Sequence, residues 1–191
     1  MGNIKLKDKT GNEVEAKFKK LDASYIDKIM ELQKDIIDNL LDKNFYASTD
    51  KEGFISDINR GAHIVGCVTS DDELIAMGVY IKFGYDDCNY GYDLDIEGEE
   101  LLKVGQIEST VVRESFRGNR LQYIICSKLE DIAREDNISI LGATVAPKNI
   151  YSLNNFKRLG YSVEKEKLKY GNYLRYILKK ELWWCKNEQK A

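Results

Sequence analysis

Apolar residues along the chain recur either at every second position or at every third to fourth position, and these two periods predict strands and helices. Helical spacing predicts four helices, over residues 26–41, 54–58, 121–133 and 149–159. Alternating or continuous apolar runs predict an N-terminal hairpin that turns at residues 10–12, and six further strands over residues 63–69, 74–81, 104–112, 138–145, 161–168 and 172–178. A capping-box pattern, Thr49 with Glu52, is expected to open the second helix.

The order of these elements predicts an α/β (α+β) fold. Strands 104–112 and 138–145 are separated by one helix, which implies a parallel pair joined by a crossover. The flanking pieces are expected to pair antiparallel. We therefore predict a single mixed, mostly antiparallel sheet with a central parallel pair, flanked by about four helices. No linker is visible, and we expect residues 1–191 to form one domain.

Composition removes several classes of function. With 43% hydrophobic residues the chain can form a packed core, and its net charge of −3 argues against a nucleic-acid partner. No apolar run approaches 18 residues and the first 20 residues are polar, so we expect no membrane partner and a cytoplasmic protein. Four widely spaced cysteines and a single histidine, His63, offer no paired metal ligands, so no metal is expected.

A basic turn joins strand 104–112 to the next helix. It contains Arg113, Arg117 and Arg120 with Gly118, and it lacks the acidic or hydroxyl cap that usually opens a helix. The free N–H groups at a helix start attract anions, arginine side chains suit phosphate, and glycine allows close approach. The turn is therefore a candidate phosphate site, with a solvated basic loop as the alternative.

Two stretches resemble the motifs of one family. The run Arg117-Gly118-Asn119-Arg120-Leu121-Gln122 between strand and helix is similar to the acetyl-CoA-binding motif of the GNAT N-acetyltransferases. The run from Asn149 to Tyr161 resembles the later motif of that family, at the expected order and spacing. The resemblance implies a GNAT-like fold and acetyl-CoA as a substrate.

The resemblance also implies roles for residues of the cofactor site. Val111 and Val112 would offer main-chain groups to the pantetheine arm, where two parallel strands part. Asn149 and Ser152 would contact its thiol end, although Asn149 also reads as a plain helix cap. The backbone N–H groups of the turn would surround the pyrophosphate; its members are Arg117, Gly118, Asn119, Arg120, Leu121 and Gln122.

Two residues of this turn depart from the family pattern. Arg120 stands where the family usually has glycine, and Gln122 stands where it has glycine or alanine. We expect that the backbone need not adopt positive φ there; if Arg120 does, the cost is on the order of 1 kcal/mol. In either backbone conformation, the Arg120 side chain would add a phosphate contact of its own.

Glu108 is the expected general base, because an acidic residue often stands there in the family and a charge between apolar strand neighbours is costly without a partner or a function. A structural ion pair is the alternative. By alternation Glu108 should share a face with Thr110 and Val112, and the N–H of Val112 would stabilise the oxyanion. The acid stays open: Phe156 replaces the usual tyrosine, Tyr151 is a fallback, and a thiolate can leave without one.

These features predict an N-acetyltransferase that moves acetyl directly from acetyl-CoA to a primary amine, expected to be a small molecule, with a protein N-terminus or lysine as the variant. A non-catalytic CoA-binding sensor or interaction module is the alternative. The acidic stretch 85–100 would either attract a cationic acceptor or form a solvated loop. The apolar run Leu182–Cys185 would pack on its own domain or form a contact between copies, so the chain is expected to be a monomer or a homodimer.

Overall fold

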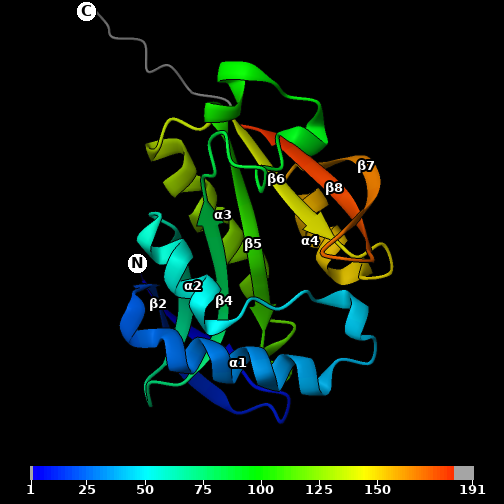
Figure 1. Cartoon of the computed structure of the whole chain (residues 1–191). Coiled ribbons are helices and arrows are strands. Elements are labelled where there is room, and N and C mark those ends of the chain that lie inside the picture. The colour runs from blue at the N-terminus through cyan, green and yellow to red at the C-terminus, as the bar shows by residue number, and fades with distance from the viewer. Residues whose placement is uncertain (1, 183–191) are drawn as a thin grey trace, which may run out of the picture.

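The computed structural model describes residues 2–182, and its centre is one eight-stranded mixed sheet (Figure 1). The strands are β1 (Asn3–Lys7), β2 (Glu13–Leu21), β3 (His63–Thr69), β4 (Leu74–Ile81), β5 (Val104–Val112), β6 (Ile140–Val145), β7 (Ser162–Lys169) and β8 (Tyr173–Glu181). Their order across the sheet is β1-β2-β3-β4-β5-β6-β8-β7. Among the described strands, β5 and β6 form the parallel pair and the other neighbours are antiparallel, which confirms the predicted fold class.

Four α-helices cover the two faces of the sheet (Figure 1). Helices α1 (Ile26–Asn39) and α2 (Lys51–Asn59) pack on one face, and α3 (Leu121–Glu135) and α4 (Ile150–Arg158) pack on the other. Each face has its own apolar cluster: Ile29 and Leu32 of α1 bury against one side, and Ile125 and Leu129 of α3 against the other. Helix α3 is the crossover that makes β5 and β6 parallel.

Two predicted helix boundaries were wrong for physical reasons. Helix α1 ends at Asn39 rather than Leu41, because Leu40 is already extended and Leu41 is fully exposed. Helix α2 is capped by Asp50, whose carboxylate accepts from the Gly53 N–H over 2.8 Å, rather than by Thr49. The Thr49 backbone is instead held by a buried side chain of α1, as described below.

The parallel pair opens before either strand ends. Pairing between β5 and β6 stops at Ile107 and Ala143, yet β5 continues to Val112 and β6 to Val145. Figure 1 shows the two strands diverging, with the segment that joins α1 to α2 crossing in front. The unpaired edges of the two strands therefore face an opening within the sheet.

A bulge in β5 lies beside this opening. Val79 pairs with Glu108 and Met77 with Val111, so Ser109 and Thr110 together face Gly78 of β4. Ser109 adopts a φ of 49°, which is unusual for a residue other than glycine. The extra residue reverses the alternation that the sequence suggested, and Val112 turns to the α3 side while Val111 packs on the α1 side.

Three other expectations concern membrane spans, metal ligands and the apolar run near the C-terminus. Within residues 2–182 no helix combines the length and the apolar character needed to cross a bilayer. The same residues contain no cluster of three or more His, Cys, Asp or Glu side chains suited to a metal ion. Of the apolar run predicted at the C-terminus, Leu182 is buried, and residues 183–185 lie outside the described part.

Candidate active site

A cavity of about 190 Å³ lies where β5 and β6 diverge, on the face covered by α1 and α2. It is lined by the segment from Phe45 to Thr49, by β5 from Ile107 to Thr110, by the end of β6 from Thr144 to Ala146, and by Asn149, Ser152 and Phe156 of the α4 region. Tyr90, Tyr170 and Arg175 complete the wall. Among these lining residues, Glu108 is the one acidic side chain and Arg175 the one basic side chain.

Glu108 is held in the cavity by its neighbour two positions earlier on β5. The Gln106 side chain is 1% exposed, and its Nε2 donates to Glu108 Oε1 over 2.5 Å. Its Oε1 accepts from the Tyr90 N–H over 2.9 Å, and Nε2 also contacts the Cys88 carbonyl at 3.3 Å. Gln106 therefore fixes both the carboxylate and the segment that covers it.

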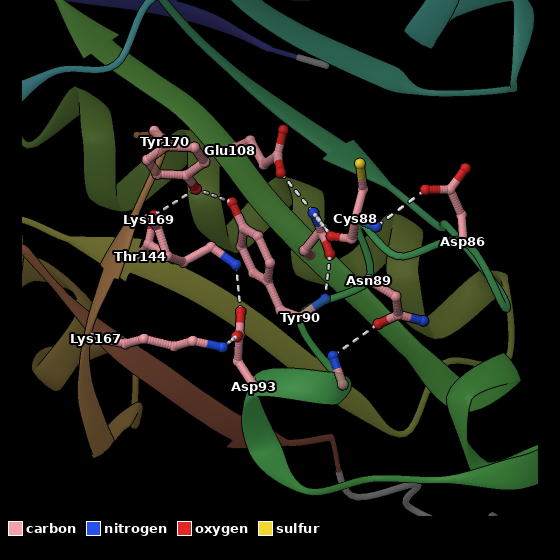
Figure 2. Close-up of polar contacts among 12 residues, drawn as sticks. Asp86, Cys88, Asn89, Tyr90, Asp93, Glu108, Thr144, Lys167, Lys169 and Tyr170 are labelled. Atoms are coloured by element: carbon pink, nitrogen blue, oxygen red, sulfur yellow. Dashed lines mark hydrogen bonds and ion pairs between the residues drawn. The ribbon is translucent and has the colours of Figure 1, made fainter. Parts of the chain in front are cut away.

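Two tyrosine hydroxyls lie beside this carboxylate, as Figure 2 shows. The hydroxyls of Tyr90 and Tyr170 are hydrogen-bonded, and that of Tyr170 also lies 3.0 Å from Thr144 Oγ1. Burial raises the pKa of both phenols, and the negative charge of Glu108 raises each pKa further. Both hydroxyls consequently keep their protons at neutral pH and can donate hydrogen bonds into the cavity.

A buried glutamine on α1 builds the opposite wall. Gln33 is 2% exposed; its Oε1 accepts from the Tyr46 hydroxyl at 2.8 Å and from the Thr49 N–H at 3.0 Å. Its Nε2 donates to the Thr49 carbonyl over 2.7 Å. Burial raises the pKa of Tyr46, so this hydroxyl is also protonated. The segment 45–49 is thereby fixed to α1 by three hydrogen bonds.

The main chain of β5 presents donors and acceptors to the opening. The Arg113 N–H donates to the Ile75 carbonyl of β4 over 2.8 Å. Because successive N–H groups of a strand point to opposite sides, the Val112 N–H points away from β4, toward the side from which β6 has separated. By the same alternation the N–H of Val111, like that of Arg113, points toward β4.

The start of α3 is uncapped, as the sequence suggested. Arg120 occupies the N-cap position with no side-chain hydrogen bond, and its φ of 58° is left-handed, as is the 93° of Gly118. The expectation that Arg120 could avoid positive φ was therefore wrong, because the chain must reverse sharply to enter α3. A Cβ added at Gly118 would meet no atom within 4 Å, so the space before this loop is open. Arg117 and Arg120 are both exposed there.

Asn119 attaches this turn to the edge of the sheet. Its Oδ1 accepts from the Lys7 N–H at 3.0 Å, and its Nδ2 donates to the Lys7 carbonyl at 2.7 Å and to the Phe116 carbonyl at 3.0 Å. The side chain is thus fully used within the protein. Asn119 can offer a ligand its backbone, while its side chain fixes the turn.

Gln122 and two α4 residues form a polar cluster at the opening. Gln122 Nε2 donates to Ser152 Oγ over 2.8 Å and to Thr110 Oγ1 over 3.1 Å, and its Oε1 accepts from Asn155 over 2.8 Å. Asn149 caps α4, accepting from the Ser152 N–H at 3.2 Å, so its predicted cap role is confirmed. Leu121, next to Gln122, is buried in the α3-side core.

Other candidates from the sequence lie elsewhere. Tyr151 is 82% exposed and does not line the cavity, whereas Phe156 does. Three carboxylates of the acidic stretch form ion pairs: Asp93 bonds Lys167 of β7 at 2.6 Å and also Lys169, Asp95 bonds Lys165 of β7 at 2.5 Å, and Asp86 bonds Arg60, which follows α2, at 2.9 Å. None of these carboxylates lines the cavity, so they do not supply its charge.

Sequence reasoning missed several lining residues, namely Tyr90, Tyr170, Arg175 and the wall held by Gln33. Tyr170 lies in the turn between β7 and β8 with a φ of 54°, and no motif marks it. Gln33 fell on a helical face of apolar residues, and a polar residue at a buried position was the available signal.

Comparison with known proteins agrees with this geometry. Solved structures that share the fold include a ribosomal-protein-alanine N-acetyltransferase from Brucella melitensis (TM-score 0.65, 16% identity, covering 87% of this chain and 99% of that one). A Salmonella typhimurium protein described as a candidate acetyltransferase, solved with acetyl-CoA, has a TM-score of 0.66 and 13% identity, covering 92% of this chain and 99% of that one. A phosphinothricin acetyltransferase from Sinorhizobium meliloti, in complex with AcCoA, has a TM-score of 0.65 and 12% identity, covering 87% of this chain and 88% of that one.

At these identities the structural likeness establishes the fold. A comparison with curated protein sequences gives no match. The sequence profile described as "Acetyltransferase (GNAT) family" matches residues 26–161, well over half of the chain. The parallel pair that opens, the uncapped basic turn and the cavity that contains Glu108 agree with this match, and the chain belongs to the GNAT family of acetyltransferases.

Proposed function

We propose that this protein transfers the acetyl group of acetyl-CoA directly to a primary amine of a small molecule, acting as a single domain with Glu108 as the general base. One observation carries the proposal: the opening between β5 and β6 lies between a cavity that contains Glu108 and an uncapped, basic helix start. A thioester substrate that spans this opening would have its phosphates at the helix start and its reactive carbon in the cavity.

The residues of the turn suit the pyrophosphate. The first N–H groups of α3 have no capping side chain, and the helix dipole favours negative charge there. Arg117 and Arg120 add forked donors from the exposed side. The pantetheine arm would then run along β5 at the free N–H of Val112, with Asn149 and Ser152 on the other side of the opening, while the N–H of the neighbouring Val111 points toward β4.

The reaction needs one proton removed and one charge stabilised. Glu108 takes a proton from the amine, and the amine nitrogen then attacks the thioester carbonyl carbon. The Val112 N–H donates to the oxygen that becomes negative. When the carbon–sulfur bond breaks, the amide forms and the thiolate of CoA leaves and takes up a proton.

Several hydroxyls could return that proton. Tyr151 remains a prediction for this role, but its side chain lies on the exposed side of α4. Tyr90 and Tyr170 are better placed, because both line the cavity and keep their protons at neutral pH. A thiol with a pKa near 8.5 can also take its proton from water, so an acid would raise the rate modestly.

The cavity favours a small acceptor over a protein. Its volume of about 190 Å³ is below the usual range of ligand pockets, roughly 300–1,000 Å³. The segment 45–49 is fixed across its front by Gln33. A polypeptide acceptor would need an open groove at this place, whereas a small amine fits.

Replacement of the base tests the proposal. Glu108→Gln should lower kcat with a panel of amines by about 10²- to 10⁴-fold, while acetyl-CoA should still raise the melting temperature. Glu166→Gln, an exposed change of the same kind on β7, should alter neither. The double variant Arg117→Ala/Gly118→Asp should lose the thermal shift with both CoA and acetyl-CoA.

The same measurements separate the rival function. A thermal shift with acetyl-CoA but no acetylation of any amine by the wild-type protein would favour a non-catalytic CoA-binding module. Absence of any shift with either CoA ligand would overturn both functions.

A further inference from the structure

Arg175 projects from β8 toward the same face of the sheet as Glu108. Its neighbour Tyr176 packs against the core on the α3 side, and alternation along the strand turns Arg175 to the opposite face. The residue is 3% exposed and lines the cavity with Glu108. The cavity therefore has an acidic group from β5 and a guanidinium from β8.

The guanidinium of Arg175 is incompletely satisfied. Its Nη1 donates to the Leu174 carbonyl over 2.9 Å, but its buried Nη2 has no hydrogen-bond partner among the described residues. The rings of Tyr170 and Tyr173 lie 5.8 and 5.1 Å from the guanidinium carbon. Within residues 2–182 no carboxylate forms an ion pair with it.

A buried charge without a counter-ion is costly for the fold. Water no longer solvates it, and burial lowers the pKa of the Arg175 guanidinium accordingly. Arginine nevertheless remains protonated in proteins. The negative charge of Asp42 acts on the Arg175 guanidinium from a distance, but no carboxylate of the described chain forms an ion pair with it. Such a residue is expected where a ligand supplies the missing anion.

We propose that the acceptor is a small amine that also carries a carboxylate, such as an amino acid, and that Arg175 binds this carboxylate. The inference rests on the proposed function and specifies its acceptor. Arg175 holds the anionic end, and this leaves the amine end for Glu108.

A carboxylate fits better than a larger anion. The forked N–H groups of a guanidinium match the two oxygens of a carboxylate, and Nη2 is free to complete such a pair. A cavity of about 190 Å³ must hold the acetyl carbon together with the acceptor, which favours a compact molecule. Binding at Arg175 would also discriminate strongly, because an acceptor without the anion leaves the buried cation unpaired.

Matched acceptors test the proposal. Release of free CoA would be measured with L-amino acids, with the corresponding amino acid amides and decarboxylated amines, and with phosphoethanolamine. The wild type should show a kcat/KM for the acids at least 10-fold above that for their amides and amines. Arg175→Met should lower kcat/KM for the acids 10-fold or more, mainly through KM, and change the values for the amides and amines that lack a carboxylate less than 3-fold.

Two variants serve as controls. Arg158→Met removes an exposed arginine of α4, outside the cavity, and should leave the preference intact. Arg175→Lys keeps the charge without the fork and should retain part of the preference. Without ligand, Arg175→Met should melt no lower than wild type, because it removes a buried charge that has no ion-pair partner in the described part of the chain.

Binding distinguishes this inference from the proposed function. If no amine is acetylated, the proposed function fails. The rise in melting temperature that amino acids cause at saturating CoA then still tests Arg175. A rise in wild type that Arg175→Met loses would support the carboxylate site. An unchanged acid-to-amide ratio, or an unchanged shift, in Arg175→Met would overturn the proposal. A preference for phosphoethanolamine over the carboxylates would replace the carboxylate with a phosphate.

Discussion

Gln122 of α3 donates a hydrogen bond to Ser152 of α4 over 2.8 Å, and this contact bridges the two helices at the opening of the sheet. The same amide reaches Thr110 of β5 at 3.1 Å. The family usually has glycine or alanine at the position of Gln122. The larger side chain therefore supplies links between β5, α3 and α4 where the proposed pantetheine route passes.

Gln122→Ala should weaken the free protein and strengthen its response to the substrate. Loss of three hydrogen bonds should cost about 1–3 kcal/mol of unfolding free energy. Because the bridge no longer competes with the pantetheine arm, the melting temperature should rise more with acetyl-CoA than it does for wild type. Asn155→Ala, which removes one of these bonds, should destabilise without the larger shift. A smaller ligand shift in Gln122→Ala would instead mean that the side chain contacts the substrate.

Arg120 combines a strained backbone with an exposed charge beside the Tyr123 ring, whose centre lies 5.0 Å from the guanidinium. Arg120→Gly should change the unfolding free energy by less than about 0.5 kcal/mol, because relief of the left-handed strain is offset by greater freedom of the unfolded chain. CoA affinity should fall about 3- to 10-fold, with a weaker dependence on salt. Calorimetry would measure both.

Arg120→Asn is the matched variant, because asparagine tolerates positive φ but carries no charge. It should lose the same affinity as Arg120→Gly. Wild-type affinity in both variants would show that the side chain makes no phosphate contact.

The sequence predicted the fold well because the fold depends on periodicity. Apolar spacing placed the crossover helix between two strands, and this alone required the parallel pair of β5 and β6. The bulge at Ser109 could not be predicted from the sequence, because its φ of 49° falls on a serine and not on a glycine, the residue that usually marks such a conformation. It arises from pairing with β4, and for that reason the predicted faces of Thr110 and Val112 were wrong.

The site was predictable only where local chemistry reveals it. The basic turn stands out along the chain because it has arginines where an acidic or hydroxyl helix cap is usual, and Glu108 stands out because it is charged between apolar strand neighbours. Tyr90, Tyr170 and Arg175 reach the cavity from separate elements, and only the tertiary fold brings them together. The acidic stretch misled for the same reason, since its lysine partners lie on β7.

Gln33→Leu should raise the acceptor KM without affecting CoA. The buried amide fixes Tyr46 and Thr49, and a leucine would leave their polar groups unpaired at a cost of about 1–3 kcal/mol for each group. The loosened segment 45–49 would define the cavity less well, so KM should rise several-fold while the thermal shift with CoA persists. Glu31→Leu, exposed on the same helix, is the control and should leave KM unchanged. An unaltered acceptor KM in Gln33→Leu would exclude the segment from acceptor binding.

Asp57 of α2 makes stability depend on pH through its proximity to the cavity. Burial, and then the negative charge of Glu108, raise the pKa of its carboxyl from 3.8 to about 6. Because the folded state holds this proton more tightly than the unfolded chain, the contribution of Asp57 to stability falls as pH rises from about 4 to 6 and stays low above that range. Asp57→Asn should therefore match wild type near pH 4 and exceed it near pH 8 by on the order of 1–2 kcal/mol, after allowance for screening by water. Glu108→Gln should flatten the same pH profile in denaturant titrations by removing the repelling charge. A wild-type slope in Asp57→Asn would show that Asp57 does not cause the pH dependence, and a wild-type slope in Glu108→Gln would show that the two carboxylates do not interact.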